Sequence, residues 1–233
     1  MTAPVAVVLI TLNEAHHMAQ VMENLAGFAS EVHVLDSFST DGTVEIAKRY
    51  GAHVVQREFT DFADQWNHAL TALPIRAPWT MKMDPDERLS PALKQSLHAA
   101  FAAGAAAAMT VDIQLAFLGK MLPVRLCLLR VWRTGTCRFD GKINEHAVTD
   151  AAPMHVKGVL EHWDSPDLEH WFTKQNRYST AEAKRALALL PTRTPSEKQR
   201  PLRAFLKRNW SRIPLRYLLL HVCHLWKVQP WRS

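Results

Sequence analysis

Residues 81–87 read Met-Lys-Met-Asp-Pro-Asp-Glu and bring three carboxylates to the end of an apolar strand. Carboxylate oxygens are hard ligands that suit Mg²⁺ or Mn²⁺, and such a cation can bridge phosphate oxygens and neutralise their charge. Ligands of open α/β sheets bind at the carboxyl ends of parallel strands, so the stretch predicts a metal site. The alternative is a solvated loop whose acids favour the N-terminus of the following helix.

Short apolar strands and helical segments alternate around this stretch. We expect strands over residues 5–12, 32–35, 53–55 and 79–83. Between the first two, a helical pattern places four apolar residues on one face: Met18, Val21, Met22 and Leu25. Further helices are predicted over residues 43–50, with Gly51 at the C′ position, and over residues 62–73. The alternation predicts an α/β, Rossmann-like fold with a mostly parallel, helix-covered sheet.

The second half of the chain follows a different pattern. Ser90-Pro91 is typical of an N-cap followed by Pro at N1 and opens a predicted helix to about residue 103. Short strand-like runs separated by turns fill residues 107–163, which indicates a mixed or antiparallel region. A long helix over residues 168–190 precedes a Pro-bounded linker at 191–201. We therefore expect a catalytic domain at 1–190 and a tail at 191–233.

The charge of the chain is unevenly distributed. Of 28 Lys and Arg residues ten lie in residues 191–233, where Glu197 is the one acidic residue. A basic tail on a mildly acidic body predicts contact with a polyanion, either anionic lipid or nucleic acid. The nucleic-acid alternative leaves the carboxylate clusters unexplained.

The tail also contains an amphipathic pattern. One helical face is apolar and the positions off it are basic: Leu215, Leu218, Leu219, Val222, Leu225 and Trp226 against Arg212, Arg216, His224 and Lys227. With Trp210 and Trp231 beside it, such a helix suits an anionic membrane surface. Packing of this face on the body or on another subunit is the alternative.

Three cysteines and the hydropathy exclude several classes of protein. Cys127, Cys137 and Cys223 form an odd, widely spaced set, which argues against a disulfide framework and a structural zinc site and favours the cytoplasm. No window reaches the length of uncharged apolar residues that a membrane span requires. Residues 1–12 lack a basic n-region and a cleavage site, so they predict a buried strand and not a signal peptide.

Two more polar loops follow predicted strands. Residues 36–43 read Asp-Ser-Phe-Ser-Thr-Asp-Gly-Thr, in which a carboxylate can accept hydrogen bonds from a base or ribose edge, whereas Asp41 is also a plausible helix cap. Residues 11–14 read Thr-Leu-Asn-Glu after the first strand. The loops after the first, second and fourth strands should therefore meet on one edge of the sheet.

Taken together, these motifs resemble glycosyltransferase family 2. The shared motifs are T-x-N-E, D-S-x-S-x-D-G-T, F-x-D-F-A-x-Q-x-N-x-A-L from Phe59 to Leu70, and D-x-D-E, followed by Gly141–His146 and Leu160–Trp163. The similarity spans roughly residues 5–190 and is greatest to lipopolysaccharide-core β-glucosyltransferase-like enzymes. It implies a GT-A nucleotide-sugar fold and an inverting, Mg²⁺- or Mn²⁺-dependent transfer of a hexose from a UDP-sugar to a cell-envelope glycan or lipid-linked acceptor.

The resemblance also implies a role for individual residues. The donor-binding set is Thr11, Asn13, Glu14, Asp36, Ser39, Asp41, Gln65, Asn67 and Asp84. Asp86 and His162 would bind the metal ion, and Glu145 would be the catalytic base. Without the resemblance, Glu145 would be a solvated surface acid and His162 a core histidine.

Two segments depart from the family pattern. The helix that usually reads Q-R-N is Gln65-Trp66-Asn67 here, so a basic contact to the donor is missing or replaced. The stretch before residues 129–133 is shortened, which leaves the acceptor unassigned. A nucleotidyltransferase is the rival enzyme class, but the first strand is not followed by a Gly-rich basic loop.

Overall fold

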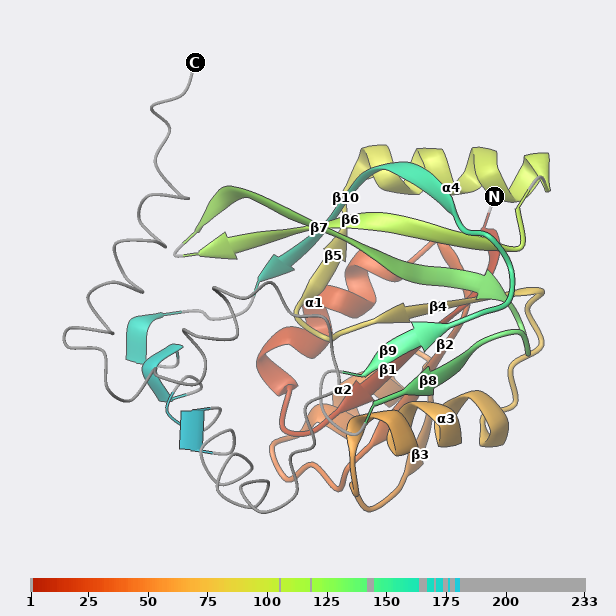
Figure 1. The fold of residues 1–233 in the computed structure, drawn as a ribbon. Coiled ribbons are helices and arrows are strands. Elements are labelled where there is room, and N and C mark those ends of the chain that lie inside the picture. Colours follow the sequence, from red (N-terminus) through yellow and green to blue (C-terminus); the bar gives the residue numbers. More distant parts are fainter. Residues whose placement is uncertain are drawn as a thin grey trace, which may run out of the picture. The chain divides into compact units, whose positions relative to one another are not determined.

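A computed structural model of the chain describes residues 2–104, 106–117, 119–141, 145–163, 167–169, 171–173, 176 and 179–180 (Figure 1). By its contacts the chain divides into two units, residues 1–121 with 125–164, and residues 122–124 with 165–233. The described residues of the second unit from 168 onward are helical, as predicted. The predicted linker and basic tail, residues 191–233, lie outside the described residues, and the division into 1–190 and 191–233 stays a prediction.

Among the described residues, eight strands form one mixed sheet in the order β3-β2-β1-β4-β7-β6-β10-β5. In that order, they span His53–Gln56, Ala29–Asp36, Ala3–Thr11, Trp79–Met83, Lys120–Arg133, Ala108–Phe117, Met154–Trp163 and Glu87–Leu89. The first four in this order pair in parallel, and β7 pairs antiparallel with both β4 and β6. Two short strands, β8 (Arg138–Asp140) and β9 (His146–Val148), form a separate antiparallel pair. The predicted α/β class, with a parallel first half and a mixed second half, is confirmed.

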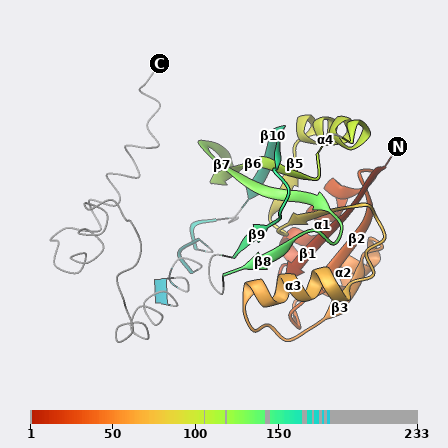
Figure 2. The same ribbon diagram turned by 45° about the vertical axis from the view of Figure 1, so that its right-hand side comes forward.

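Helices cover both faces of this sheet (Figures 1 and 2). They are α1 (Ala15–Leu25), α2 (Thr43–Arg49), α3 (Phe62–Ala72) and α4 (Pro91–Ala103). Ser90 caps α4 by accepting a 3.2 Å hydrogen bond from Leu93 N–H, with Pro91 behind it, as the sequence predicts. No helix among the described residues has the length and hydropathy needed to cross a membrane.

Alternate residues of β1 belong to two hydrophobic cores. Val5, Val7 and Leu9 pack in one core with α1 and α4, whereas Val8 packs in another with Trp66 of α3. All four β1 side chains are fully buried, and burial of one such side chain contributes about 1.5–3 kcal/mol. The period of two along the strand therefore fixes which side chains face α3.

Gly158 permits α4 to pack closely on β10. A Cβ atom at Gly158 would lie 2.6 Å from the backbone of Leu93, and its φ of +110° is in the region that favours glycine. The same contact brings Ser90 Oγ within 3.2 Å of the N–H of Val159. The start of α4, just after the acidic stretch, is thereby fixed to β10.

Candidate active site

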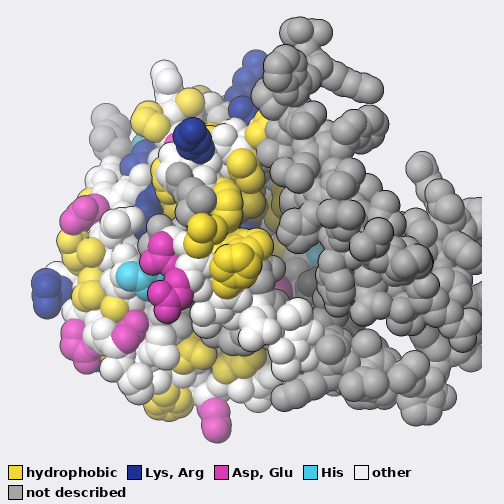
Figure 3. All heavy atoms as spheres, turned by 90° about the vertical axis from the view of Figure 1, so that its left-hand side faces the viewer, with side chains coloured by type: hydrophobic (Ala, Val, Ile, Leu, Met, Phe, Trp, Pro, Cys, Tyr) yellow, Lys and Arg dark blue, Asp and Glu magenta, His cyan; other side chains and the backbone are white. Residues whose placement is uncertain are grey.

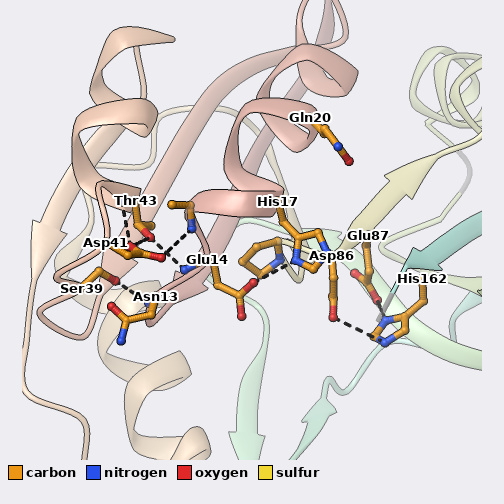
Figure 4. Close-up of polar contacts among 12 residues, drawn as sticks. Asn13, Glu14, His17, Gln20, Ser39, Asp41, Thr43, Asp86, Glu87 and His162 are labelled. Carbon is orange, nitrogen blue, oxygen red and sulfur yellow. Dashed lines mark hydrogen bonds and ion pairs between the residues drawn. The ribbon is translucent and has the colours of Figure 1, made fainter. Parts of the chain in front are cut away.

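The loops after β1 and β2 are joined by side-chain hydrogen bonds at the carboxyl edge of the sheet (Figure 4). The N–H of Asn13 donates to Ser39 Oγ over 2.8 Å, and Asn13 Oδ1 accepts from Thr40 N–H over 2.9 Å. Asn13 has a φ of 57°, a conformation that Asn tolerates better than most residues. The structure thus brings the predicted residues Asn13 and Ser39 together.

Asp41 serves the N-termini of two helices. Its Oδ2 atom accepts from the N–H of Ala15, the first residue of α1, over 3.0 Å. Its Oδ1 atom accepts from the N–H and the hydroxyl of Thr43, the first residue of α2, over 3.1 and 2.5 Å. Burial alone would raise the pKa of Asp41, but these hydrogen bonds outweigh it and hold the pKa below its ordinary value. Asp41 therefore fixes both loops, in keeping with the capping alternative.

Asp36, the last residue of β2, is a buried carboxylate that connects these loops. Its carboxylate is fully buried and accepts from Thr11 Oγ1 over 2.8 Å and from Gln56 Nε2 over 3.0 Å. Ser39 adds its N–H at 2.8 Å and its hydroxyl at 2.5 Å. Thr11 and Asp36 are thus part of one network, which orders the edge where a donor would bind.

Glu14 and His17 extend the edge toward the acidic stretch (Figure 4). Glu14 Oε2 lies 3.0 Å from His17 Nδ1, and the Glu14 N–H donates to Thr43 Oγ1 over 2.9 Å. With His16 they form a group whose ligand atoms lie within 4.8 Å of one another. Glu14 was predicted to bind the donor, but the two histidines were not predicted, although three ligand-type side chains within four residues were a signal for them.

The three acids after β4 have different surroundings. Glu87 is fully buried, accepts from the Asp84 N–H over 2.8 Å and pairs with Arg130 Nη2 at 2.7 Å. The same Arg130 atom lies 3.4 Å from Asp84 Oδ2. Asp86 instead faces the imidazole of His162 (Figure 4). Glu87 is therefore a structural residue, and the ligand-binding roles of Asp84 and Asp86 stay predictions.

Several cations keep Asp84 ionised. Burial would raise the pKa of Asp84, but the guanidinium of Arg130, the ammonium of Lys82 and the imidazole of His162 outweigh it and hold the pKa below its usual value. Asp84 is thus a negatively charged hydrogen-bond acceptor at the predicted binding site for the sugar donor.

The predicted metal ligands Asp86 and His162 lie side by side. Asp86 Oδ2 lies 3.6 Å from His162 Nε2, while His162 Nδ1 lies 3.9 Å from Glu87 Oε1. The N–H of Trp163 donates to the Asp86 carbonyl over 2.7 Å, and His162 pairs with Glu87 across β10 and β5. The backbone therefore fixes both side chains, and a carboxylate with an imidazole suits Mn²⁺ or a similar ion.

Glu145, the predicted base, directly precedes β9 and pairs with a buried lysine of the central sheet. Its Oε1 atom lies 2.8 Å from Lys82 Nζ, and Lys82 is two residues before Asp84. Its sequence neighbour Asn144 lies outside the described residues. Lys82 was missed by the sequence analysis because a lysine within a strand has no local signal for a partner 63 residues away.

Three consecutive residues of α3 contact three different elements. Gln65 is buried, accepts from Arg57 Nη1 over 2.9 Å and donates to Ser37 Oγ over 3.2 Å. Asn67 Nδ2 donates to the Phe139 carbonyl and Asn67 Oδ1 accepts from the Phe139 N–H, both over 2.8 Å. Trp66 between them lies under the Lys82 ammonium. Gln65 therefore contacts the loop after β2 and Asn67 contacts β8, and the donor-binding role predicted for both stays a prediction.

One face of the molecule combines ligand-type side chains with apolar surface. Figure 3 shows acidic side chains and a histidine beside a patch of exposed hydrophobic side chains. A cavity of about 500 Å³ lies elsewhere, lined by residues 135–138 and 149–151 with Ala107, and contains none of the predicted site residues. The candidate site is thus defined by its polar groups and not by that cavity.

Comparison with known proteins finds one matching family. The sequence model of the glycosyl transferase family 2 matches residues 6–185. An uncharacterized glycosyltransferase of Rickettsia bellii is 34% identical over 206 residues, which cover 79% of this chain and 68% of that protein. The lipopolysaccharide core biosynthesis glycosyltransferase LpsC of Rhizobium meliloti is 28% identical over 194 residues, covering 77% of this chain and 70% of LpsC.

Among solved structures, the chain is similar to a part of glucosyl-3-phosphoglycerate synthase from Mycobacterium tuberculosis, in a crystal with Mn²⁺, UDP and glucosyl-3-phosphoglycerate. The identity is 26% and the TM-score 0.40, over 49% of this chain and 44% of the synthase. The matched stretch of this chain spans between 65% and 71% of the length of its curated relatives.

Proposed function

Because the chain belongs to glycosyl transferase family 2, we propose that it transfers a hexose from a UDP-sugar to an acceptor hydroxyl, with inversion at the anomeric carbon and with a divalent cation. The similarity to LpsC supports a lipopolysaccharide-core or other cell-envelope glycan as the acceptor. Such an acceptor favours work at the inner face of the inner membrane, with residues 191–233 on its anionic surface.

One observation carries the proposal. The segment from Lys82 to Glu87 contacts the predicted base on one side and the predicted metal ligand on the other, because Lys82 holds Glu145 at 2.8 Å and Asp86 faces His162 at 3.6 Å. A single strand end therefore joins a proton acceptor to a site for a leaving diphosphate.

In this proposal, the loops after β1 and β2 bind the nucleotide-sugar donor. Gln65 contacts this edge through Ser37. The hydrogen-bonded edge itself consists of Thr11, Asn13, Glu14, Asp36, Ser39 and Asp41. Because the chain's own contacts already order these loops, a nucleoside binds with little further loss of conformational entropy. Asp84 completes the edge beside the ribose and diphosphate.

Glu145 performs the proton transfer. Its carboxylate removes the proton of the acceptor hydroxyl while that oxygen forms a bond to the anomeric carbon on the face opposite the diphosphate. The bond from the anomeric carbon to the diphosphate oxygen breaks, and UDP leaves with the electron pair. A cation held by Asp86 and His162 would supply charge neutralisation for the departing diphosphate.

A thermal-shift panel with UDP-, GDP-, ADP- and CMP-sugars, each with and without Mn²⁺, tests the proposal. Selective binding of one donor at 100 times its Kd stabilises the fold by about 2.7 kcal/mol, so a UDP-sugar with Mn²⁺ should raise Tm clearly above the others. Release of UDP, and not of pyrophosphate, should follow when an acceptor extract is added. Equal shifts for all donors, or pyrophosphate release, would contradict the proposal.

A further inference from the structure

Lys82 is a cation within a buried strand. Each side chain of β4 is buried, and Lys82 is 8% exposed. It pairs with Val8 of β1, so both side chains lie on the face that packs against α3. An ammonium in such a place costs free energy unless its charge is compensated.

Three groups surround the Lys82 ammonium. Glu145 Oε1 accepts at 2.8 Å, the ring centroid of Trp66 lies 4.6 Å from Nζ, and that of Phe139 lies 5.2 Å away. A desolvated cation over an aromatic face is attracted by the negative charge of that face, and the carboxylate supplies the countercharge. The rings stabilise the charge of the ammonium while one of its N–H groups donates a hydrogen bond to Glu145.

The two rings form a rigid support. Trp66 and Phe139 stack with centroids 5.3 Å apart and an interplanar angle of 25°, and Trp132 packs on Phe139 edge to face. Asn67 fixes Phe139 through both backbone hydrogen bonds of 2.8 Å. The ammonium therefore has one well-defined position between α3 and β8.

Glu145 depends on this support for its own position. It directly precedes β9, and Asp140 of β8 pairs with His146 of β9. The strands β8 and β9 form a sheet of two strands apart from the main sheet, and among the described residues the ion pair with Lys82 connects the Glu145 carboxylate to β4. Lys82 thus links the predicted base to the strand that ends at Asp84.

We propose that Lys82 is a positioning residue for Glu145: it holds the carboxylate on the strand that also carries the donor-side acids. The inference rests on the proposed function of Glu145 as the base. Misplacement of a reacting group by about 1 Å costs about 10²-fold in rate. Lys82 acts through Glu145 and transfers no proton itself.

A double-mutant cycle tests this role. Lys82→Met, Glu145→Gln and the double variant are compared by kcat with donor and acceptor saturating, and by donor Kd. Lys82→Met should lower kcat about 10²-fold and Glu145→Gln by about 10²–10⁴-fold, with each donor Kd changed by less than about threefold. The double variant should be no slower than Glu145→Gln alone, because the lysine then has no base to position.

Additive losses in the double variant would overturn the positioning role and leave the base assignment intact. Wild-type kcat in Glu145→Gln would instead remove the proposed function of Glu145, whatever Lys82→Met does. The two failures are therefore distinguishable within one set of variants.

Two further variants control for folding. Lys94 also has its ammonium over a phenyl ring, 5.9 Å from the centroid of Phe28, and donates to the Asn24 carbonyl. Lys94→Met should therefore keep kcat within about twofold. Lys82→Gln retains a hydrogen-bond donor toward Glu145 and should recover about tenfold of the lost kcat. If Lys82→Met does not fold, the same cycle with Lys82→Gln decides by the same criterion.

Discussion

The proposed donor edge and the proposed acceptor side of this glycosyl transferase family 2 member hold their carboxylates in different ways. Asp36 and Asp41 accept several short hydrogen bonds each, from loops less than 30 residues apart. Glu145 is held by an ion pair with Lys82, which is 63 residues away in the chain. The proposed donor edge is therefore fixed by several hydrogen bonds, whereas among the described residues the predicted base is held by one long-range ion pair.

This difference predicts how the two regions respond to substitution. Loss of one hydrogen bond at the donor edge leaves the others in place, so effects there should be small. Among the described residues, no other contact replaces the ion pair between Glu145 and Lys82. Substitution of either residue should therefore lower kcat strongly and leave the donor Kd nearly unchanged.

The largest effect is expected for Glu145→Gln, which should lower kcat by about 10²–10⁴-fold, the usual contribution of a general base. Asp140 is a matched control because it is an exposed acid on the same pair of strands, paired with Arg138 at 3.8 Å. Asp140→Asn should keep kcat, measured by UDP release with saturating acceptor. A loss confined to Asp140→Asn would transfer the role of base to that residue.

A large loss of stability is expected for Glu87→Gln. The substitution removes the shorter of two ion pairs of the buried Arg130, at 2.7 Å, and leaves the one with Asp84 at 3.4 Å. We therefore expect a loss near the lower end of the about 3–5 kcal/mol that removal of one partner of a buried ion pair costs. Asp86→Asn, one residue earlier, should change the free energy of unfolding by less than about 1 kcal/mol. Urea titrations of both variants measure this, and equal stabilities would show that the two acids are not divided into structural and ligand roles.

The same contrast explains what the sequence could reveal. Local patterns identified β1, β4, the Ser90-Pro91 start of α4 and the meeting of the three loops, because period, capping and strand direction act over a few residues. Motif resemblance identified the family, which the match to residues 6–185 confirms.

Local patterns could not identify Lys82 or Arg130. Each is a cation whose partner lies more than 40 residues away, Glu145 for one and Glu87 for the other. Asn67 was assigned to the donor by resemblance, but its amide is engaged by the backbone of Phe139, a contact across 72 residues. Pairings of this kind depend on the assembled sheet and have no signal in spacing or propensity.

A moderate effect is expected for the metal pair. Asp86→Ala and His162→Ala should each weaken Mn²⁺ binding about 10–100-fold, as loss of a metal-site contact typically does. His53 is an exposed histidine on β3, at the other end of the strand order from β10 and β5, and His53→Ala should leave the affinity unchanged. Electron paramagnetic resonance of free Mn²⁺ gives the three affinities. A loss in His53→Ala equal to that in His162→Ala would point to a different Mn²⁺ site.

The smallest effect is expected at the proposed donor edge, for Asp41→Ala, at about 1 kcal/mol of stability, the typical cost of removing a side chain that caps a helix. The folded state lowers the pKa of Asp41 below its ordinary 3.8. Its contribution is therefore complete above that value and is lost as the pH falls through the lowered folded-state pKa. Unfolding measured from pH 7 to pH 2 should show the wild type and the variant converging in acid, and a constant difference would contradict the assigned hydrogen bonds.

We infer that the loops after β1 and β2 bind the nucleotide sugar and that Glu145 catalyses the transfer to the acceptor. Calorimetric titration of a UDP-sugar with Mn²⁺ into the wild type, Asp86→Ala and Glu145→Gln tests it most directly. The structure predicts a Kd for Glu145→Gln within about threefold of the wild type and a loss of at least about tenfold for Asp86→Ala. Equal weakening in both variants would contradict the division of the site into these two regions.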